Sequence, residues 1–94
     1  MSGTAKATKF IDNDRVIVTE WRFAKMGDNT GWHRHGYDYV VVPLMDGQLK
    51  LVTKDGESHA DMKKGVPYFR PVGVEHDVVN ANDGEYAFIE VELK

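Results

Sequence analysis

The feature that most constrains the fold of this 94-residue chain is a succession of short β-forming runs, separated by turn signals roughly every ten residues. The runs are rich in β-branched and aromatic residues, and Asp-Gly pairs that favour turns separate several of them. No segment shows the sustained 3.6-residue periodicity of an amphipathic helix. The pattern therefore predicts an all-β sandwich or barrel. Strands are expected over residues 15–23, 37–44, 48–53, 57–62, 67–70, 76–80 and 86–93.

The length of the chain indicates one domain with a small core. A chain of this size buries only about 60–65% of its unfolded surface, so self-association would add useful burial and a homodimer is expected. In the last expected strand Phe88 and Ile89 point to opposite faces, which indicates cover on both sides, by a second sheet or by another subunit. Residues 1–9 are small and polar, so we expect a flexible N-terminal arm there and a single barrel domain over residues 10–94.

Composition narrows the class of partner. The net charge of −3 provides no basic surface for nucleic acid. No apolar run is long enough to cross a membrane or to act as a secretory signal, so a cytoplasmic protein is expected. The chain has no cysteine, and any transition metal must therefore be held by nitrogen and oxygen ligands.

Three histidines are the candidate metal ligands. His33 and His35 are two positions apart, so their side chains point to the same side if the segment is a strand. His76, from a later strand, would complete one face of the coordination shell of a metal. Three neutral imidazoles leave the charge of a divalent ion uncompensated and leave coordination positions open, so the centre would attract an anionic oxygen donor.

Two motifs around these histidines resemble the signature of the cupin superfamily. The first runs from Gly27 to Gly47 and contains His33-Arg-His35. The second, from Gly65 to Asn80, matches the family form G-x5-P-x-G-x2-H-x3-N at every fixed position. The resemblance spans over half of the chain. It implies a cupin-type double-stranded β-helix, or jelly-roll, barrel with a divalent metal held inside by the three histidines.

The first motif departs from the family pattern because it lacks the glutamate that usually follows the second histidine. Val40 and Tyr39 occupy the positions where the family places that glutamate. Asp38 is a candidate for contacting the metal directly or through water. Glu75 is a candidate for orienting a neighbouring ligand, and the alternative for Glu75 is exposure to water. The three-histidine set resembles that of thiol and β-diketone dioxygenases, which implies Fe(II). Zn, Ni, Mn and Cu remain alternatives, since imidazole ligands do not select one metal.

Several side chains are candidates for a substrate pocket. Arg70 opens the loop that leads to His76, and an inward guanidinium would bind a carboxylate through two hydrogen bonds. An exposed or interface arginine is the alternative. Small barrels that hold a ligand are walled by apolar and aromatic side chains, with core packing as the alternative for each. For Tyr39 packing against an outer sheet is preferred. The other candidates for the pocket are Tyr68, Trp21, Phe23, Phe88 and Val40.

Within the superfamily, residues 30–43, 68–70 and 73–76 are similar to small single-domain cupins associated with β-alanine degradation. The resemblance favours a metal-dependent enzyme acting on a small, oxygenated or carboxylated metabolite, with a dioxygenase as one candidate reaction. The main alternative is a non-catalytic cupin that binds a small ligand or senses a metal. A metal-free cupin with a histidine as general base and a purely structural module are further alternatives. The sequence assigns no catalytic residue.

Overall fold

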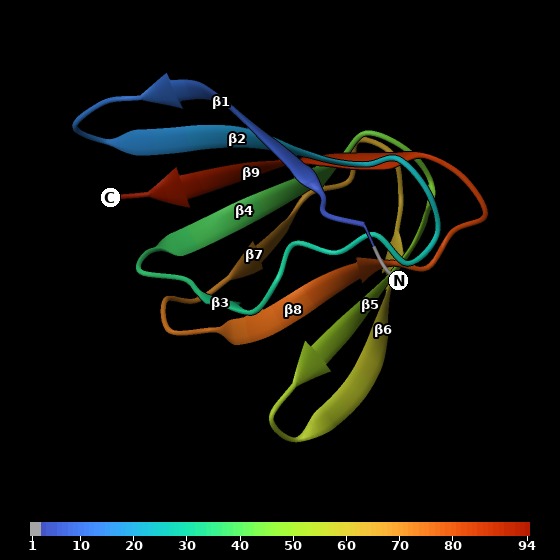
Figure 1. Ribbon diagram of the computed structural model, residues 1–94. Coiled ribbons are helices and arrows are strands. Elements are labelled where there is room, and N and C mark those ends of the chain that lie inside the picture. Colours follow the sequence, from blue (N-terminus) through green and yellow to red (C-terminus); the bar gives the residue numbers. More distant parts are fainter. Residues whose placement is uncertain (1–2) are drawn as a thin grey trace.

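The computed structural model describes residues 3–94, and these residues form two antiparallel sheets without a helix (Figure 1). The all-β prediction is confirmed. One sheet has five strands in the order β1-β2-β9-β4-β7, and the other has four in the order β3-β8-β5-β6. The nine strands of the described residues are β1 (Lys6–Asp12), β2 (Val16–Phe23), β3 (His33–Arg34), β4 (Asp38–Pro43), β5 (Gly47–Thr53), β6 (Gly56–Met62), β7 (Tyr68–Arg70), β8 (Glu75–Asn80) and β9 (Tyr86–Leu93).

The chain passes repeatedly between the two sheets, which makes them the two walls of one barrel. It crosses from β4 to β5, returns from β6 to β7, and crosses again between β7, β8 and β9 (Figure 1). Inward side chains of both walls form the core, because successive residues of a strand point to opposite faces. The buried apolar cluster consists of Ala5, Phe23, Tyr39, Val41, Leu49, Met62, Val78, Tyr86 and Phe88.

The outer face of the five-stranded sheet carries apolar residues as well. The strand register places one apolar residue from each of the five strands in a continuous line across the sheet. We call this line the outer row. Its members are half-buried or exposed and have no second layer over them among the described residues. The outer row consists of Ile11, Val18, Val91, Val40 and Phe69.

The N-terminal segment differs from the prediction of a flexible arm over residues 1–9. Strand β1 begins at Lys6, which pairs with Arg22 of β2, and Ala5 before it is buried. The boundary expected between residues 9 and 10 therefore falls inside a strand. Met1 and Ser2 of the expected arm lie outside the described residues. The strand escaped the sequence analysis because its first residues are small or charged, as is common on sheet edges.

The loop before β8 is shaped to deliver His76. Gly73 adopts a φ of 95°, which other residues rarely adopt, and its N–H donates to the carbonyl of His35 at 2.9 Å. The N–H of His35 in turn donates to the carbonyl of Val74 at 2.9 Å. Backbone pairing thus continues past the end of β3, and the second histidine of the His-x-His pair stays in register with the strand that carries the third.

Asn80, at the end of β8, anchors the neighbouring turns. Its side chain is fully buried, and its amide donates to the carbonyls of Lys25 and Gly84 at 3.0 and 2.8 Å. These two hydrogen bonds tie the turns at Lys25 and Gly84 to the end of β8.

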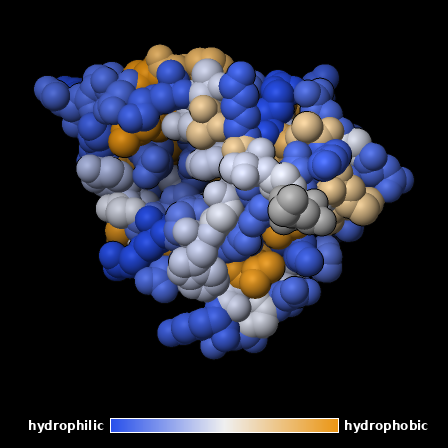
Figure 2. Space-filling view, in the orientation of Figure 1, coloured by the Kyte–Doolittle hydropathy of each residue, from blue (hydrophilic) through white to orange (hydrophobic). Residues whose placement is uncertain are grey.

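The surface in Figure 2 is mostly hydrophilic, with hydrophobic residues in small, separate groups. Small exposed apolar groups of this kind are normal on protein surfaces. Among residues 3–94 there is no helix long and apolar enough to span a bilayer. The cytoplasmic location stays a prediction.

Candidate metal centre

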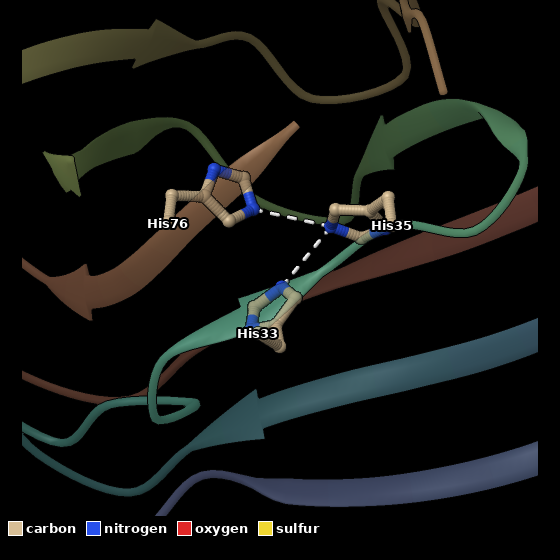
Figure 3. A group of neighbouring side chains, drawn as sticks. All are labelled: His33, His35 and His76. Carbon is tan, nitrogen blue, oxygen red and sulfur yellow. Dashed lines mark hydrogen bonds between the residues drawn. The ribbon is translucent and has the colours of Figure 1, made fainter. Parts of the chain in front are cut away.

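The three histidines of the sequence motifs converge on one point between the walls of the barrel (Figure 3). His33 on β3 lies directly opposite His76 on β8 in the register of the two strands. His35 follows β3 and brings its Nε2 to 3.0 Å from Nε2 of His33 and 3.1 Å from Nε2 of His76. The candidate ligand atoms of all three lie within 4.8 Å of one another. Among residues 3–94, no carboxylate joins this group.

The Nδ1 atoms of two rings face oxygen acceptors, and the hydrogen bond of His33 assigns the tautomer of that ring. Nδ1 of His33 donates to the carbonyl of Gly31 at 2.8 Å, and Nδ1 of His35 lies 3.4 Å from Oε1 of Glu90. A proton on each Nδ1 leaves a lone pair on each Nε2. Two lone pairs 3.0 Å apart repel each other, and a cation bound by both would remove the repulsion. The donor set therefore fits a divalent metal. Metal-bound histidines usually have such an oxygen acceptor at the ring nitrogen that does not bind the metal.

The buried rings are neutral at ordinary pH. Burial lowers the pKa of His35 to about 3, with further lowering by the neighbouring His33 and His76. Burial and His33 lower the pKa of His76 to about 4, despite an opposing effect of Asp77. Metal ligation requires neutral imidazole, so both rings are in the form that binds a metal. For the same reason the contact of His35 with Glu90 is not an ion pair near neutral pH.

Glu90 on β9 is a site residue that the sequence analysis missed. Its side chain is buried, with 6% exposure, and Oε2 accepts a hydrogen bond from Nε1 of Trp21 at 3.0 Å. Burial raises the pKa of Glu90 to about 7, although the Trp21 hydrogen bond opposes the shift. The available signal was its position two residues after Phe88, which placed both side chains on the same face of the last strand.

Two aromatic rings support the histidines from the five-stranded sheet. Tyr39 stacks on His35, with ring centroids 3.8 Å apart and planes 19° apart. Trp21 lies nearly parallel to His33, with centroids 6.3 Å apart and planes 11° apart. Packing of Tyr39 against an outer sheet was the preferred expectation and is wrong, because the alternation of β4 buries Tyr39 and turns Val40 outward.

A cavity of about 160 Å³ opens beside the histidines and is lined mainly by apolar and aromatic groups. His33, His76, Tyr39 and Glu90 contribute to its wall. Of the side chains expected at a pocket, Trp21, Tyr68, Arg70 and Phe88 line this cavity.

Four other candidates lie away from the cavity. Phe23 is fully buried in the core and packs against Phe88 at a centroid distance of 5.9 Å, while Val40 belongs to the outer row. The side chain of Asp38 accepts a hydrogen bond from the N–H of Val72 at 2.8 Å. Glu75 is exposed and lies 3.6 Å from Arg34. Neither Asp38 nor Glu75 joins the histidine group, because each projects from its strand on the side away from the core.

Arg70 brings a positive charge to the cavity wall. Its guanidinium lies over the ring of Tyr68 at 4.4 Å, and Nη1 donates to the carbonyl of Phe69 at 3.0 Å. In the described part of the chain, no carboxylate lies within 4 Å of this guanidinium. The cavity thus combines a histidine group with an arginine that has no acidic partner among residues 3–94.

Comparisons with known proteins agree with this architecture. The chain is 56% identical to the β-alanine degradation protein BauB of Pseudomonas aeruginosa PAO1, over the full length of both. It also matches the crystal structure of a cupin domain from Bordetella pertussis Tohama I, with 51% identity, a TM-score of 0.97 and coverage of 100% of this chain and 97% of that one. No protein-family model matches the chain.

A more distant structure supports the fold alone. An RmlC-like cupin from Methanocaldococcus jannaschii with a double-stranded β-helix fold is 16% identical, with a TM-score of 0.77 over 98% of this chain and 82% of that one. The predicted cupin-type jelly roll is therefore confirmed. A strong match to a full-length relative, a near-identical solved fold and the three converging histidines agree: the chain belongs to the cupin superfamily.

Proposed function

We propose that His33, His35 and His76 hold one divalent transition metal, with Fe(II) favoured, and that this centre acts on a small carboxylated metabolite. The observation that carries the proposal is the convergence of three imidazoles, two of them buried and neutral, with the Nε2 atom of His35 3.0 and 3.1 Å from those of His33 and His76. Such a cluster is unfavourable without a cation. When bound, the metal would supply Lewis acidity or, if redox-active, the capacity for oxygenase chemistry.

The cavity supports a small, negatively charged ligand. Its volume of about 160 Å³ and mostly apolar wall suit a molecule of a few carbon atoms. Arg70 would bind one carboxylate of that molecule, and its place over Tyr68 limits the motion of the guanidinium. The relative BauB is named for the degradation of β-alanine, which is itself a small carboxylic acid.

A non-catalytic cupin that binds a small ligand or a metal is the second candidate. One observation favours it: both oxygens of Glu90, the one carboxylate among the residues lining the cavity, face protein groups, namely Trp21 and His35. No free general base is therefore available beside the histidines in the cavity wall. A dioxygenase reaction does not require one, whereas an isomerase or hydrolase does.

The metal is tested by elemental analysis of protein purified without an affinity tag. We expect about one equivalent of metal per chain, and none in the double variant His33→Ala/His76→Ala. His59→Ala is the matched control, because His59 is exposed on β6 and should leave the metal content unchanged. Full metal content in the double variant would contradict the assignment.

The reaction is tested by oxygen consumption of the Fe(II)-loaded protein with a panel of small carboxylic acids, thiols and β-diketones. Turnover with one class would support the dioxygenase. Tight binding without turnover would favour the non-catalytic alternative.

We also propose that two copies associate through the outer row. The row crosses all five strands, and the same patch on a second copy would cover it in a two-fold arrangement. A mass of one chain by light scattering at micromolar concentration would refute this dimer.

A further inference from the structure

One buried carboxylate connects two of the three candidate ligands. The two oxygens of Glu90 have separate contacts, Oε2 with Nε1 of Trp21 at 3.0 Å and Oε1 with Nδ1 of His35 at 3.4 Å. Trp21 then lies nearly parallel to the ring of His33. Glu90 therefore contacts His35 directly and contacts His33 indirectly, through the ring of Trp21.

The carboxylate of Glu90 is buried without a positively charged partner among the described residues. No lysine or arginine of residues 3–94 lies within 4 Å of Glu90, and its nearest basic group is the neutral ring of His35. Burying a carboxylate without a cationic partner is costly. A metal on the far side of the imidazole would make the Nδ1 proton more acidic and would strengthen its attraction to Glu90.

We propose that Glu90 is the positioning residue of the metal centre: it keeps the proton of His35 on Nδ1 and, through Trp21, holds the ring of His33, so that both Nε2 lone pairs face the metal. This inference rests on the proposed metal site. Supporting carboxylates of this kind raise metal affinity by about 10- to 100-fold without touching the metal. The contact of 3.4 Å is longer than an ordinary hydrogen bond of about 2.7–3.2 Å and is expected to shorten when metal binds.

Glu90→Gln is the sharpest substitution, because it conserves shape and can still accept the Trp21 hydrogen bond. Its amide would turn an NH₂ group toward His35 and donate to Nδ1, which favours the tautomer with the proton on Nε2, the wrong one for ligation. We expect a fall of about 10- to 100-fold in affinity for Co(II) alone. Trp21→Phe, which keeps the ring but loses the N–H, should cause a smaller fall.

Two measurements separate positioning from a merely structural role. Competition with a chelator gives the Co(II) affinity of the full-length protein, its Glu90→Gln, Trp21→Phe and double variants, and the exposed control Glu57→Gln. Nitrogen NMR of the metal-free protein, recorded above the pKa of Glu90 of about 7 so that its carboxylate is ionised, reports the tautomer of His35. We expect the proton on Nδ1 in the native protein and on Nε2 in Glu90→Gln, and effects of the two substitutions that do not add, because both act through one carboxylate.

Co(II) affinity of Glu90→Gln within twofold of the native value, or an unchanged His35 tautomer, would overturn the inference. Additive effects of the two substitutions would also count against it. If the native protein binds no Co(II), the proposed metal site fails, whereas the tautomer still decides whether Glu90 sets the proton of His35. Should Glu90→Gln fail to fold, an unchanged affinity in Trp21→Phe would overturn the part of the inference that passes through Trp21.

Discussion

The two walls of the barrel contribute different things to the site. The four-stranded sheet, with the segment that follows β3, provides all three imidazoles. The five-stranded sheet provides no ligand to the group but lines the cavity with Trp21, Tyr39, Arg70 and Glu90. One wall would hold the metal, and the other would orient the rings and receive the ligand. The three-histidine motif therefore accounts for the candidate metal ligands only, and the groups that surround them come from the other sheet.

The lengths of the strands explain why the ligand wall needs support. Strand β3 contains two residues, and His35 lies beyond its end. The ladder of β3 with β8 therefore cannot fix the His35 ring alone, and stacking on Tyr39 together with the contact to Glu90 completes the restraint. Strands β2 and β9, with eight residues each, offer a firmer base for these supporting groups.

The largest expected effect breaks the ligand wall. His35→Ala should reduce the metal content to near zero, because two nitrogens cannot replace a three-nitrogen site. Tyr39→Phe should retain the metal, because the stacked ring remains and only the hydroxyl is lost. Elemental analysis of both variants measures the metal content. Equal metal loss in the two variants would contradict the assignment of His35 as a ligand and Tyr39 as a supporting residue.

The second prediction concerns the outer face of the supporting wall. Val91→Lys places a charge in the centre of the outer row and should convert the dimer to a monomer, with the metal content unchanged. Light scattering gives the mass, and His59→Lys on β6 serves as the control. A dimer that survives Val91→Lys must use another surface.

The third prediction separates ligand binding from metal binding. Arg70→Gln should weaken binding of a small carboxylate such as propionate by about 10- to 100-fold, the loss of a charge-assisted hydrogen-bonded pair worth roughly 1.5–3 kcal/mol. The metal content should stay the same, because Arg70 is not in the histidine group. Calorimetric titration of the metal-loaded variant tests this, and unchanged affinity would place the carboxylate elsewhere in the cavity.

The smallest expected effect is on the pH dependence of stability in the metal-free protein. His35 and His76, with pKa values lowered to about 3 and 4 from an ordinary 6.5, take up protons on unfolding. Glu90, with a pKa raised to about 7 from 4.5, releases one. Between about pH 5 and 6 unfolding should therefore bind about one net proton, so the free energy of unfolding falls as the pH is lowered.

Glu90→Gln removes the opposing contribution, so about two protons should be bound on unfolding and the fall should be about twice as steep. Urea unfolding of both proteins across this pH range measures the two slopes. Equal slopes would mean that Glu90 is ionised in the folded, metal-free protein throughout the range.

Local patterns were sufficient for the strands and the ligands. Alternating β-branched runs between turn residues predict seven strands near their observed positions, because alternation and turn chemistry are properties of neighbouring residues. The two strands that were not predicted lacked such a pattern: β1 begins with small and charged residues, and β3 has only two residues. The spacing of His33, His35 and His76 similarly identified the group that the structure brings together.

The supporting residues could not be found in this way. Glu90 is 55 residues from His35 along the chain, and only the pairing of β9 between β2 and β4 brings it to the rings. The burial of Tyr39 in place of Val40 likewise depends on which face of β4 turns inward.

The amino-acid sequence by itself determined the β class of this protein, its family and the three nitrogens that converge, because these depend on the order and spacing of nearby residues. The tertiary structure alone decided which buried groups hold those nitrogens in place and which face of the large sheet is left uncovered. Both depend on how the two sheets pair and pack against each other. The register between strands far apart in the chain is not visible in the pattern of neighbouring residues.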